Sequence, residues 1–257
     1  RRPPRSTHCI SSAASDVYKR QIYSHAQGPS LLRDAIAGAL SLTRDRVTVI
    51  HAENAGCYGH NGADDAAMDA ALLAINVPGT PILLKWERED EQRFEPYSPA
   101  TVIDVAANID HGRVQYWSAD IYSQTHSGRP FRMQSASNLI AAWEQAKALP
   151  RPIPQPGRGN HSGIHRNADP LYRFPDRRIV KHLHQDQRIR TSSTRGLGAY
   201  ANVFAIESAM DELASIENMD PVAFRLKHLE DKRARAVLNR CADLAGKHLP
   251  KPRDGYA

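Results

Sequence analysis

The stretch from Thr101 to Ser123, TVIDVAANIDHGRVQYWSADIYS, constrains the fold most strongly. Apolar and polar residues alternate on both sides of Asp110, His111 and Gly112, which is the period of a β-strand with one covered face. A short turn that contains Asp and Gly favours a tight reversal between two antiparallel strands. The sequence therefore predicts a β-hairpin over these residues.

The rest of the chain mixes helical and extended patterns. Apolar residues spaced three and four apart predict a helix over Ser30–Leu42, with Ser30 as its cap, and a second helix that begins at Asp64 and Asp65. Further helices are expected after Tyr200, from Asp220 and Pro221, and over Lys232–Lys247, and strands over Asp45–Glu53, Pro81–Asp90 and Arg177–Arg190. The predicted fold class is α+β, with mixed strands and packed helices.

The regular pattern fades between residues 128 and 170, where prolines and glycines cluster. A long irregular segment inside a domain is typical of a functional or covering loop. We therefore divide the chain into residues 1–20, a main region over 21–247 that contains this covering loop, and a tail over 248–257.

Residues 1–20 resemble a translated sequencing adaptor of the kind found in metagenomic reading frames, and they show neither a strand period nor the apolar core of a signal peptide. We expect them not to be natural protein and exclude them from the fold. The native N-terminus is then missing, so either a cytoplasmic or a periplasmic location remains open.

Composition excludes several classes of protein. The 257 residues are 41% hydrophobic, enough for a real core, and no apolar run is long enough to cross a membrane. Three cysteines without CxxC spacing predict neither a disulfide framework nor structural zinc. Residues 1–20 carry four of the six excess positive charges, so the body of the protein is nearly neutral and nucleic acid is not an expected partner.

Two glycine-rich loops each precede a predicted helix. The first, GCYGHNG, begins at Gly56, and the second, TRGLGAY, begins at Thr194. Small residues let a backbone approach a ligand closely, but neither loop matches GxxxxGK[ST] or GxGxxG, so each is either a ligand loop or a plain turn. Arg195 would suit an oxyanion, and the alternative is an exposed arginine on a turn.

Other polar residues favour ordinary structural roles. His161 and His165 lie among Pro and Gly, and His182 and His184 lack any further ligand pattern, so solvent-facing histidines are the better interpretation. Cys57 has no identifiable base apart from nearby His60, which favours a small buried residue. Glu207, Asp211 and Glu212 are expected on a solvated helix face.

Several motifs in order along the chain resemble the molybdenum-binding subunit of the xanthine dehydrogenase and aldehyde oxidase family, nearest to the isoquinoline oxidoreductase and nicotinate dehydrogenase large subunits. These motifs are SHAQG (24–28), GCYGHNGADDAA (56–67), KWERED and EPYSPA (85–100), THSGRP (125–130), RGLGAYANVFAIESAMDELA and DPVAFRLKHLED (195–231). The resemblance implies part of a molybdopterin-binding domain.

The resemblance also implies the site residues. Gln27 matches a glutamine near the metal oxo group, Gly56, Tyr58 and Gly59 match a glycine-rich loop over the cofactor, and Arg195, Gly196 and Gly198 match a second such loop. Gln27, Tyr58 and Arg195 are expected near molybdenum without ligating it. Tyr58 and Leu197 stand where the family often has phenylalanine, so the substrate pocket need not resemble that of the purine oxidases.

The chemistry implied by the resemblance is oxidation of an aldehyde or an N-heteroaromatic compound with oxygen derived from water. The implied cofactor is molybdenum–molybdopterin in its cytosine dinucleotide form, and the implied partners are a small [2Fe–2S] subunit and a cytochrome acceptor. The general-base glutamate is expected beyond Ala257, so we assign no catalytic residue and expect the chain alone to be inactive. The alternative is a noncatalytic binding or assembly module with the same fold.

Overall fold

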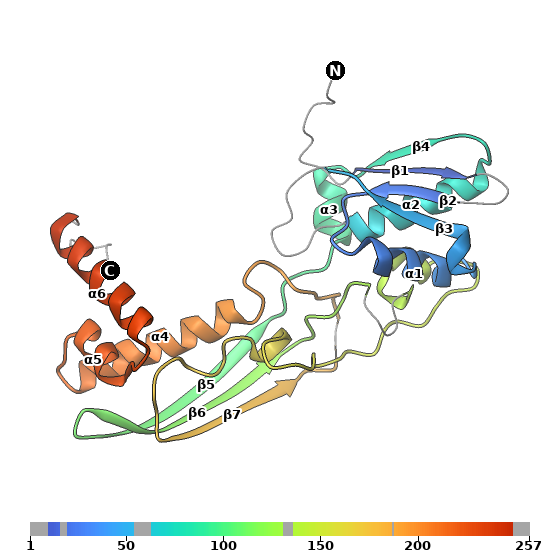
Figure 1. The fold of residues 1–257 in the computed structure, drawn as a ribbon. Helices are drawn as coiled ribbons and strands as arrows, with labels where there is room; N and C mark the ends of the chain where they lie inside the picture. The colour runs from blue at the N-terminus through green and yellow to red at the C-terminus, as the bar shows by residue number, and fades with distance from the viewer. Residues whose placement is uncertain (1–9, 16–19, 54–62, 131–135, 187, 249–257) are drawn as a thin grey trace. The chain divides into compact units, whose positions relative to one another are not determined.

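The computed structural model describes residues 10–15, 20–53, 63–130, 136–186 and 188–248 (Figure 1). The chain forms two compact units that exchange the polypeptide several times. Unit 1 contains Arg1–Ala100, Ser123–Ile164 and Leu183–Leu197, and unit 2 contains Thr101–Tyr122, His165–His182 and Gly198–Ala257. The region over 21–247, treated as one in the sequence, thus contributes to both units.

Unit 1 is built on a four-stranded sheet with the order β3-β2-β1-β4. Its strands are β1 (Ile10–Ser15), β2 (Arg20–Ser24), β3 (Val47–His51) and β4 (Ile82–Lys85). Strand β2 pairs in parallel with β3, while β1 is antiparallel to both of its neighbours. The expectation that residues 1–20 stay outside the fold is therefore corrected for β1. Pairing uses main-chain groups that every residue except proline carries, so a strand forms without an alternating pattern.

Helices α1 (Pro29–Ala39) and α2 (Ala63–Asn76) cover one face of this sheet (Figure 1). They share one core with it, whose large members are Ile22, Leu32, Ile36, Val47, Met68 and Leu139. The predicted cap of α1 is wrong, because Gly28 is the N-cap and Ser30 lies inside the first turn. Pro29 begins the helix instead, since its fixed φ and missing N–H suit that position.

The predicted strand over Pro81–Asp90 is only partly confirmed. Strand β4 ends at Lys85, and Arg88–Phe94 form helix α3. The Glu87 N–H donates to Asp90 Oδ2 at 2.9 Å, one half of a capping box, so local capping starts a helix where the strand pattern ended. The irregular segment over 128–170 is confirmed in its described residues, which contain only the short 3₁₀ turns Ala136–Asn138, Ile140–Ala142 and Gly163–His165.

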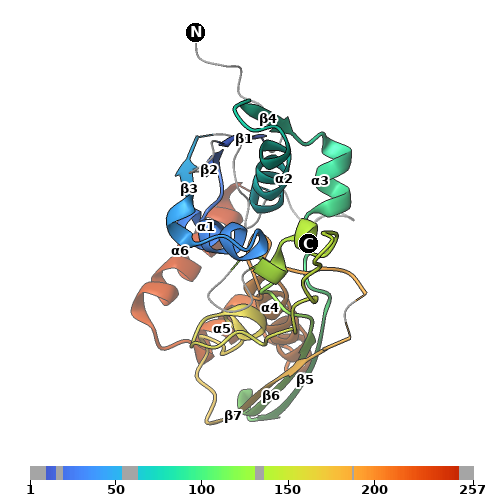
Figure 2. The same ribbon diagram turned by 90° about the vertical axis from the view of Figure 1, so that its right-hand side faces the viewer.

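Unit 2 contains the predicted hairpin. Strands β5 (Thr101–Asp110) and β6 (Arg113–Ser123) meet at His111 and Gly112, whose φ angles of 47° and 67° fit a two-residue type I′ turn. Strand β7 (Asp176–Leu183) completes a sheet with the order β5-β6-β7 (Figure 2). It realises the first half of the extended segment predicted over Arg177–Arg190.

Helices α4 (Ala199–Ile216), α5 (Pro221–His228) and α6 (Lys232–His248) follow as predicted. The side chain of Asp220 caps α5 by accepting from the Ala223 N–H at 2.8 Å. Among the described residues, no helix combines the length and the apolar character needed to cross a bilayer. The core of this unit contains Val114, Trp117, Phe174, Ile206, Met210 and Phe224.

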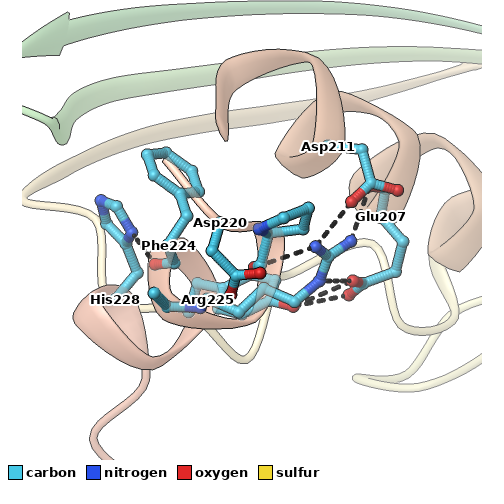
Figure 3. A network of polar contacts seen from close by, with 9 residues as sticks. Glu207, Asp211, Asp220, Phe224, Arg225 and His228 are labelled. Atoms are coloured by element: carbon cyan, nitrogen blue, oxygen red, sulfur yellow. Dashed lines mark hydrogen bonds and ion pairs between the residues drawn. The ribbon is translucent and has the colours of Figure 1, made fainter. Parts of the chain in front are cut away.

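Charged residues of α4 bind α5 instead of lying on a solvated face, which corrects the sequence interpretation. Arg225 Nε donates to Glu207 Oε2 at 2.8 Å, and its Nη1 donates to Asp211 Oδ1 at 2.7 Å (Figure 3). Glu207 also accepts from the Tyr172 hydroxyl at 2.9 Å. The third acid, Glu212, is exposed as expected. Arg225 therefore fixes the angle between the two helices.

His228 joins α5 to the hairpin inside the core of unit 2. Its Nε2 accepts from the Val114 N–H at 3.0 Å, and its Nδ1–H donates to the Phe224 carbonyl at 2.8 Å (Figure 3). These partners require the neutral ring, and burial lowers the pKa of His228 from its ordinary value of 6.5.

We expect His228→Ala to lower the free energy of unfolding by about 2 to 4 kcal/mol, because it leaves a cavity and an unpaired buried N–H. The natural chain should also lose stability as the pH falls below 6.5, since the unfolded histidine takes up a proton first. Urea unfolding at several pH values measures both effects. His184→Ala, at an exposed histidine, is the matched control, and equal losses in the two variants would contradict the assignment.

Candidate functional site

Two predicted site segments leave neighbouring parallel strands of unit 1. Ser24 at the end of β2 pairs with His51 at the end of β3, and the Ala52 N–H donates to the Ser24 carbonyl at 3.0 Å. Gln27 follows the first strand, and the glycine loop follows the second. Binding sites in such sheets form at the carboxyl ends of the strands. Gly56, Tyr58 and Gly59 lie outside the described residues, so their predicted roles stay predictions.

Gln27 is held by an arginine from the THSGRP motif. Arg129 Nη1 donates to Gln27 Oε1, and Arg129 Nη2 lies 3.3 Å from Asp64 Oδ2. Asp64 stands in the first turn of α2, directly after the glycine loop, and its side chain is only 4% exposed. The structure thus links the segment after β2 to the start of α2 through one guanidinium.

Burial dominates the electrostatics of Asp64. It raises the pKa of this carboxyl from 3.8 to about 6, with a smaller upward contribution from Asp65, while Arg129 and Arg190 act in the opposite direction. Near neutral pH the carboxylate is therefore charged at a cost that its arginine partners offset only in part.

Asp65 forms the second ion pair at the start of α2. Arg190 Nη2 donates to Asp65 Oδ2 at 2.6 Å and Nη1 to Oδ1 at 3.2 Å, with both side chains at most 9% exposed. Arg190 also donates to the carbonyls of Phe94 and Asn138, and the Ile140 N–H donates to Asp65 Oδ1. Planar bidentate pairs of this kind fix geometry as well as charge.

The two arginines are brought into place by two extended segments that touch. Ser127 bridges Ser192, Thr191 Oγ1 donates to the Thr125 carbonyl at 2.8 Å, and the Ser193 N–H donates to the His126 carbonyl at 3.1 Å. A Cβ on Gly128 would lie 2.0 Å from the Thr191 carbonyl oxygen. Only glycine therefore allows this approach.

Arg195 lies on an exposed turn that leads into α4. The Leu197 N–H donates to the Thr194 carbonyl at 2.9 Å, and Gly196 has a φ of 87°, as position i+2 of a type II turn requires. Leu197 follows with a φ of 56°, which is unusual for a residue with a side chain. Gly198 is the N-cap of α4. The predicted second glycine loop is thus a strained turn with an exposed arginine, and its contact with a ligand stays a prediction.

His126 is the clearest buried polar group without a partner. Its side chain is buried, and neither ring nitrogen has a hydrogen-bond partner among the described residues. Burial lowers its pKa to about 4, so the ring is neutral. Native proteins pair nearly all buried polar groups, and an unpaired one indicates a group that completes the site.

Sequence reasoning did not nominate Asp64, Asp65, Arg129, Arg190 or His126. The two acids were assigned only to the helix dipole, although adjacent acids in the first turn of an otherwise apolar helix are a signal for buried partners. The described residues contain no cluster of three or more His, Cys, Asp or Glu suited to a metal ion. His182 is not solvated as expected, because it binds Asp120 at 2.7 Å and stacks on Tyr122.

Gly128→Ala should destabilise unit 1 by about 2 kcal/mol or more, because the new methyl group displaces the Thr191 carbonyl. Gly246→Ala is the matched control: this helical glycine is exposed with no atom near its added Cβ, and the change should stabilise by up to about 1 kcal/mol. Chemical unfolding compares the two, and a neutral Gly128→Ala would refute the close approach.

Asp64→Asn should gain stability relative to the natural chain as the pH rises from 4 to 6. The folded carboxyl holds its proton more tightly than the unfolded one, so the natural chain loses stability over this window, while the amide does not. A pKa displaced from 3.8 to about 6 corresponds to roughly 3 kcal/mol at most. Unfolding free energies across this pH range measure the difference, and a difference independent of pH would count against the buried charge.

Comparison with known proteins supplies the family. Residues 154–229 match the molybdopterin cofactor-binding domain, a segment that includes Arg195, Gly196 and Gly198. Over 227 residues the chain is 34% identical to the B subunit of nicotinate dehydrogenase from Pseudomonas putida, covering 88% of this chain and 18% of that protein. It is 26% identical to the beta subunit of isoquinoline 1-oxidoreductase from Brevundimonas diminuta, covering 85% and 26%.

Solved structures confirm the fold. The aldehyde oxidoreductase from Desulfovibrio gigas superposes with a TM-score of 0.64 at 18% identity, over 95% of this chain and 26% of that one. The chain therefore spans about a fifth to a quarter of the length of its relatives. The predicted α+β class and the family resemblance are both confirmed: this chain is a relative of the molybdopterin-binding subunits of nicotinate dehydrogenase and isoquinoline 1-oxidoreductase.

Proposed function

We propose that this chain is part of a molybdenum hydroxylase large subunit and forms one wall of its molybdopterin site. The observation that carries this proposal is the position of Gln27 at the carboxyl end of β2, beside the exit to the glycine loop, with its amide oxygen bound by Arg129. The match over residues 154–229 supports it independently.

The described residues fit a ligand rich in anionic and acceptor oxygens. Gln27 is exposed, Arg195 is an exposed cation on the turn before α4, and the buried ring of His126 lacks a partner. Amide and guanidinium donors suit phosphate and oxo groups. Gln27 and Arg195 would hold the cofactor, and Gly196 would let the backbone approach it. When bound, molybdopterin supplies a redox centre that accepts electrons from the substrate.

The substrate class that we favour is an N-heteroaromatic compound. Two relatives are named for nicotinate and isoquinoline oxidation, and both names denote nitrogen-containing aromatic rings. An aldehyde is the alternative within the same chemistry. The family resemblance further suggests the cytosine dinucleotide form of the cofactor, a small [2Fe–2S] partner subunit and a cytochrome acceptor. None of the carboxylates in this chain is assigned as the general base.

The decisive test is substitution in a complete subunit that contains this segment. Gln27→Ala and Arg195→Ala should each lower turnover, by about 10²-fold for a lost donor to the reacting centre, while protein yield and folding stay unchanged. Gln21→Ala is the matched control, since Gln21 is an exposed glutamine on the neighbouring strand β2. Steady-state oxidation of nicotinate, with molybdenum content measured in parallel, gives the readout.

Natural turnover in both variants would remove these residues from the site. A complete subunit that folds but takes up no molybdenum would instead support a noncatalytic binding or assembly module.

A further inference from the structure

The contact with Arg129 determines which end of the Gln27 amide is available to a ligand. A guanidinium carries only donors, so the Gln27 atom that faces it must be the carbonyl oxygen Oε1. The Nε2 group is then turned away from the arginine. Because Gln27 is exposed, this NH₂ group can donate to an acceptor outside the protein.

Arg129 is itself held from two directions. Its Nη2 lies 3.3 Å from Asp64 Oδ2, and its side chain is only 21% exposed. Its backbone follows Gly128, which packs directly against the Thr191 carbonyl. A guanidinium with both its head and its main chain fixed has one geometry to offer, which preorganises the amide it binds.

We propose that Arg129 is a positioning residue that sets the Gln27 amide with Nε2 outward, so that it donates to an oxygen of the bound ligand. Asp64 anchors Arg129 and so couples the amide to the first turn of α2, where the glycine loop ends. The identity of that ligand rests on the proposed function, whereas the orientation of the amide is a property of this chain alone.

The orientation is tested by NMR on the 257-residue chain labelled with ¹⁵N and ¹³C. A hydrogen bond to Oε1 shifts the Gln27 Cδ resonance and slows rotation of its NH₂ group. We expect Arg129→Met, which keeps a long side chain without donors, to return both to the values of a free glutamine. Arg44→Met, at an exposed arginine of the same unit, is the control, and Gln21 is the internal reference.

Unchanged Gln27 resonances in a folded Arg129→Met would overturn the proposal. If that variant fails to fold, Gln27→Glu replaces it: a carboxylate still accepts from Arg129, so the Tm should stay at or above that of the natural chain, whereas Gln27→Met should lower it. A lower Tm for Gln27→Glu than for Gln27→Met would equally refute the contact.

A second measurement separates this proposal from the proposed function. In a complete subunit loaded with cofactor, Arg129→Met should lower kcat with molybdenum content and KM unchanged, and adding it to Gln27→Ala should cause no further loss. Additive losses would refute positioning through Gln27. An NMR result as expected in a chain whose complete subunit takes up no molybdenum would leave Arg129 as the orienting residue and refute only the cofactor.

Discussion

The buried pair between Asp65 and Arg190 is the interaction on which unit 1 depends. It joins the first turn of α2 to the segment that leads to Arg195, and through the carbonyls of Phe94 and Asn138 it also reaches the end of α3 and the irregular segment. Removing one partner of such a pair costs about 3 to 5 kcal/mol, because the other charge is left buried alone. These four segments are therefore stable only as a set.

Unit 2 reaches the same rigidity by other means. Its core stacks Trp117 on Phe174 with ring centroids 5.1 Å apart, and the neutral ring of His228 links a helix to a strand by two hydrogen bonds. Arg225 then fixes α4 against α5. Ionic chemistry thus orders loops in unit 1, whereas aromatic packing with a few polar ties orders regular elements in unit 2.

The sequence predicted what is local and missed what is distant. The hairpin over Thr101–Ser123 and the Asp220 cap of α5 are short-range patterns, and both are confirmed. The arginine pairs are separated by up to 125 residues, so no window of sequence contains both partners.

The same limit explains the candidate site. Gln27 was predicted through family resemblance, whereas Arg129 stood in the THSGRP motif without an assigned role, because its partners come together only in the folded chain. The end of β4 was missed for a different reason, since local capping by Asp90 outcompeted an apolar run.

The position of β1 has a consequence for handling the protein. Ile10–Ser15 pair on one side with β2 and on the other with β4, so this short segment is an interior strand of the sheet. A chain trimmed to start at Ile22 would expose the unpaired main chain of two strands at once. Open strand edges of this kind recruit other chains. Shortening the chain to its recognisable family sequence would therefore turn a paired sheet into a template for aggregation.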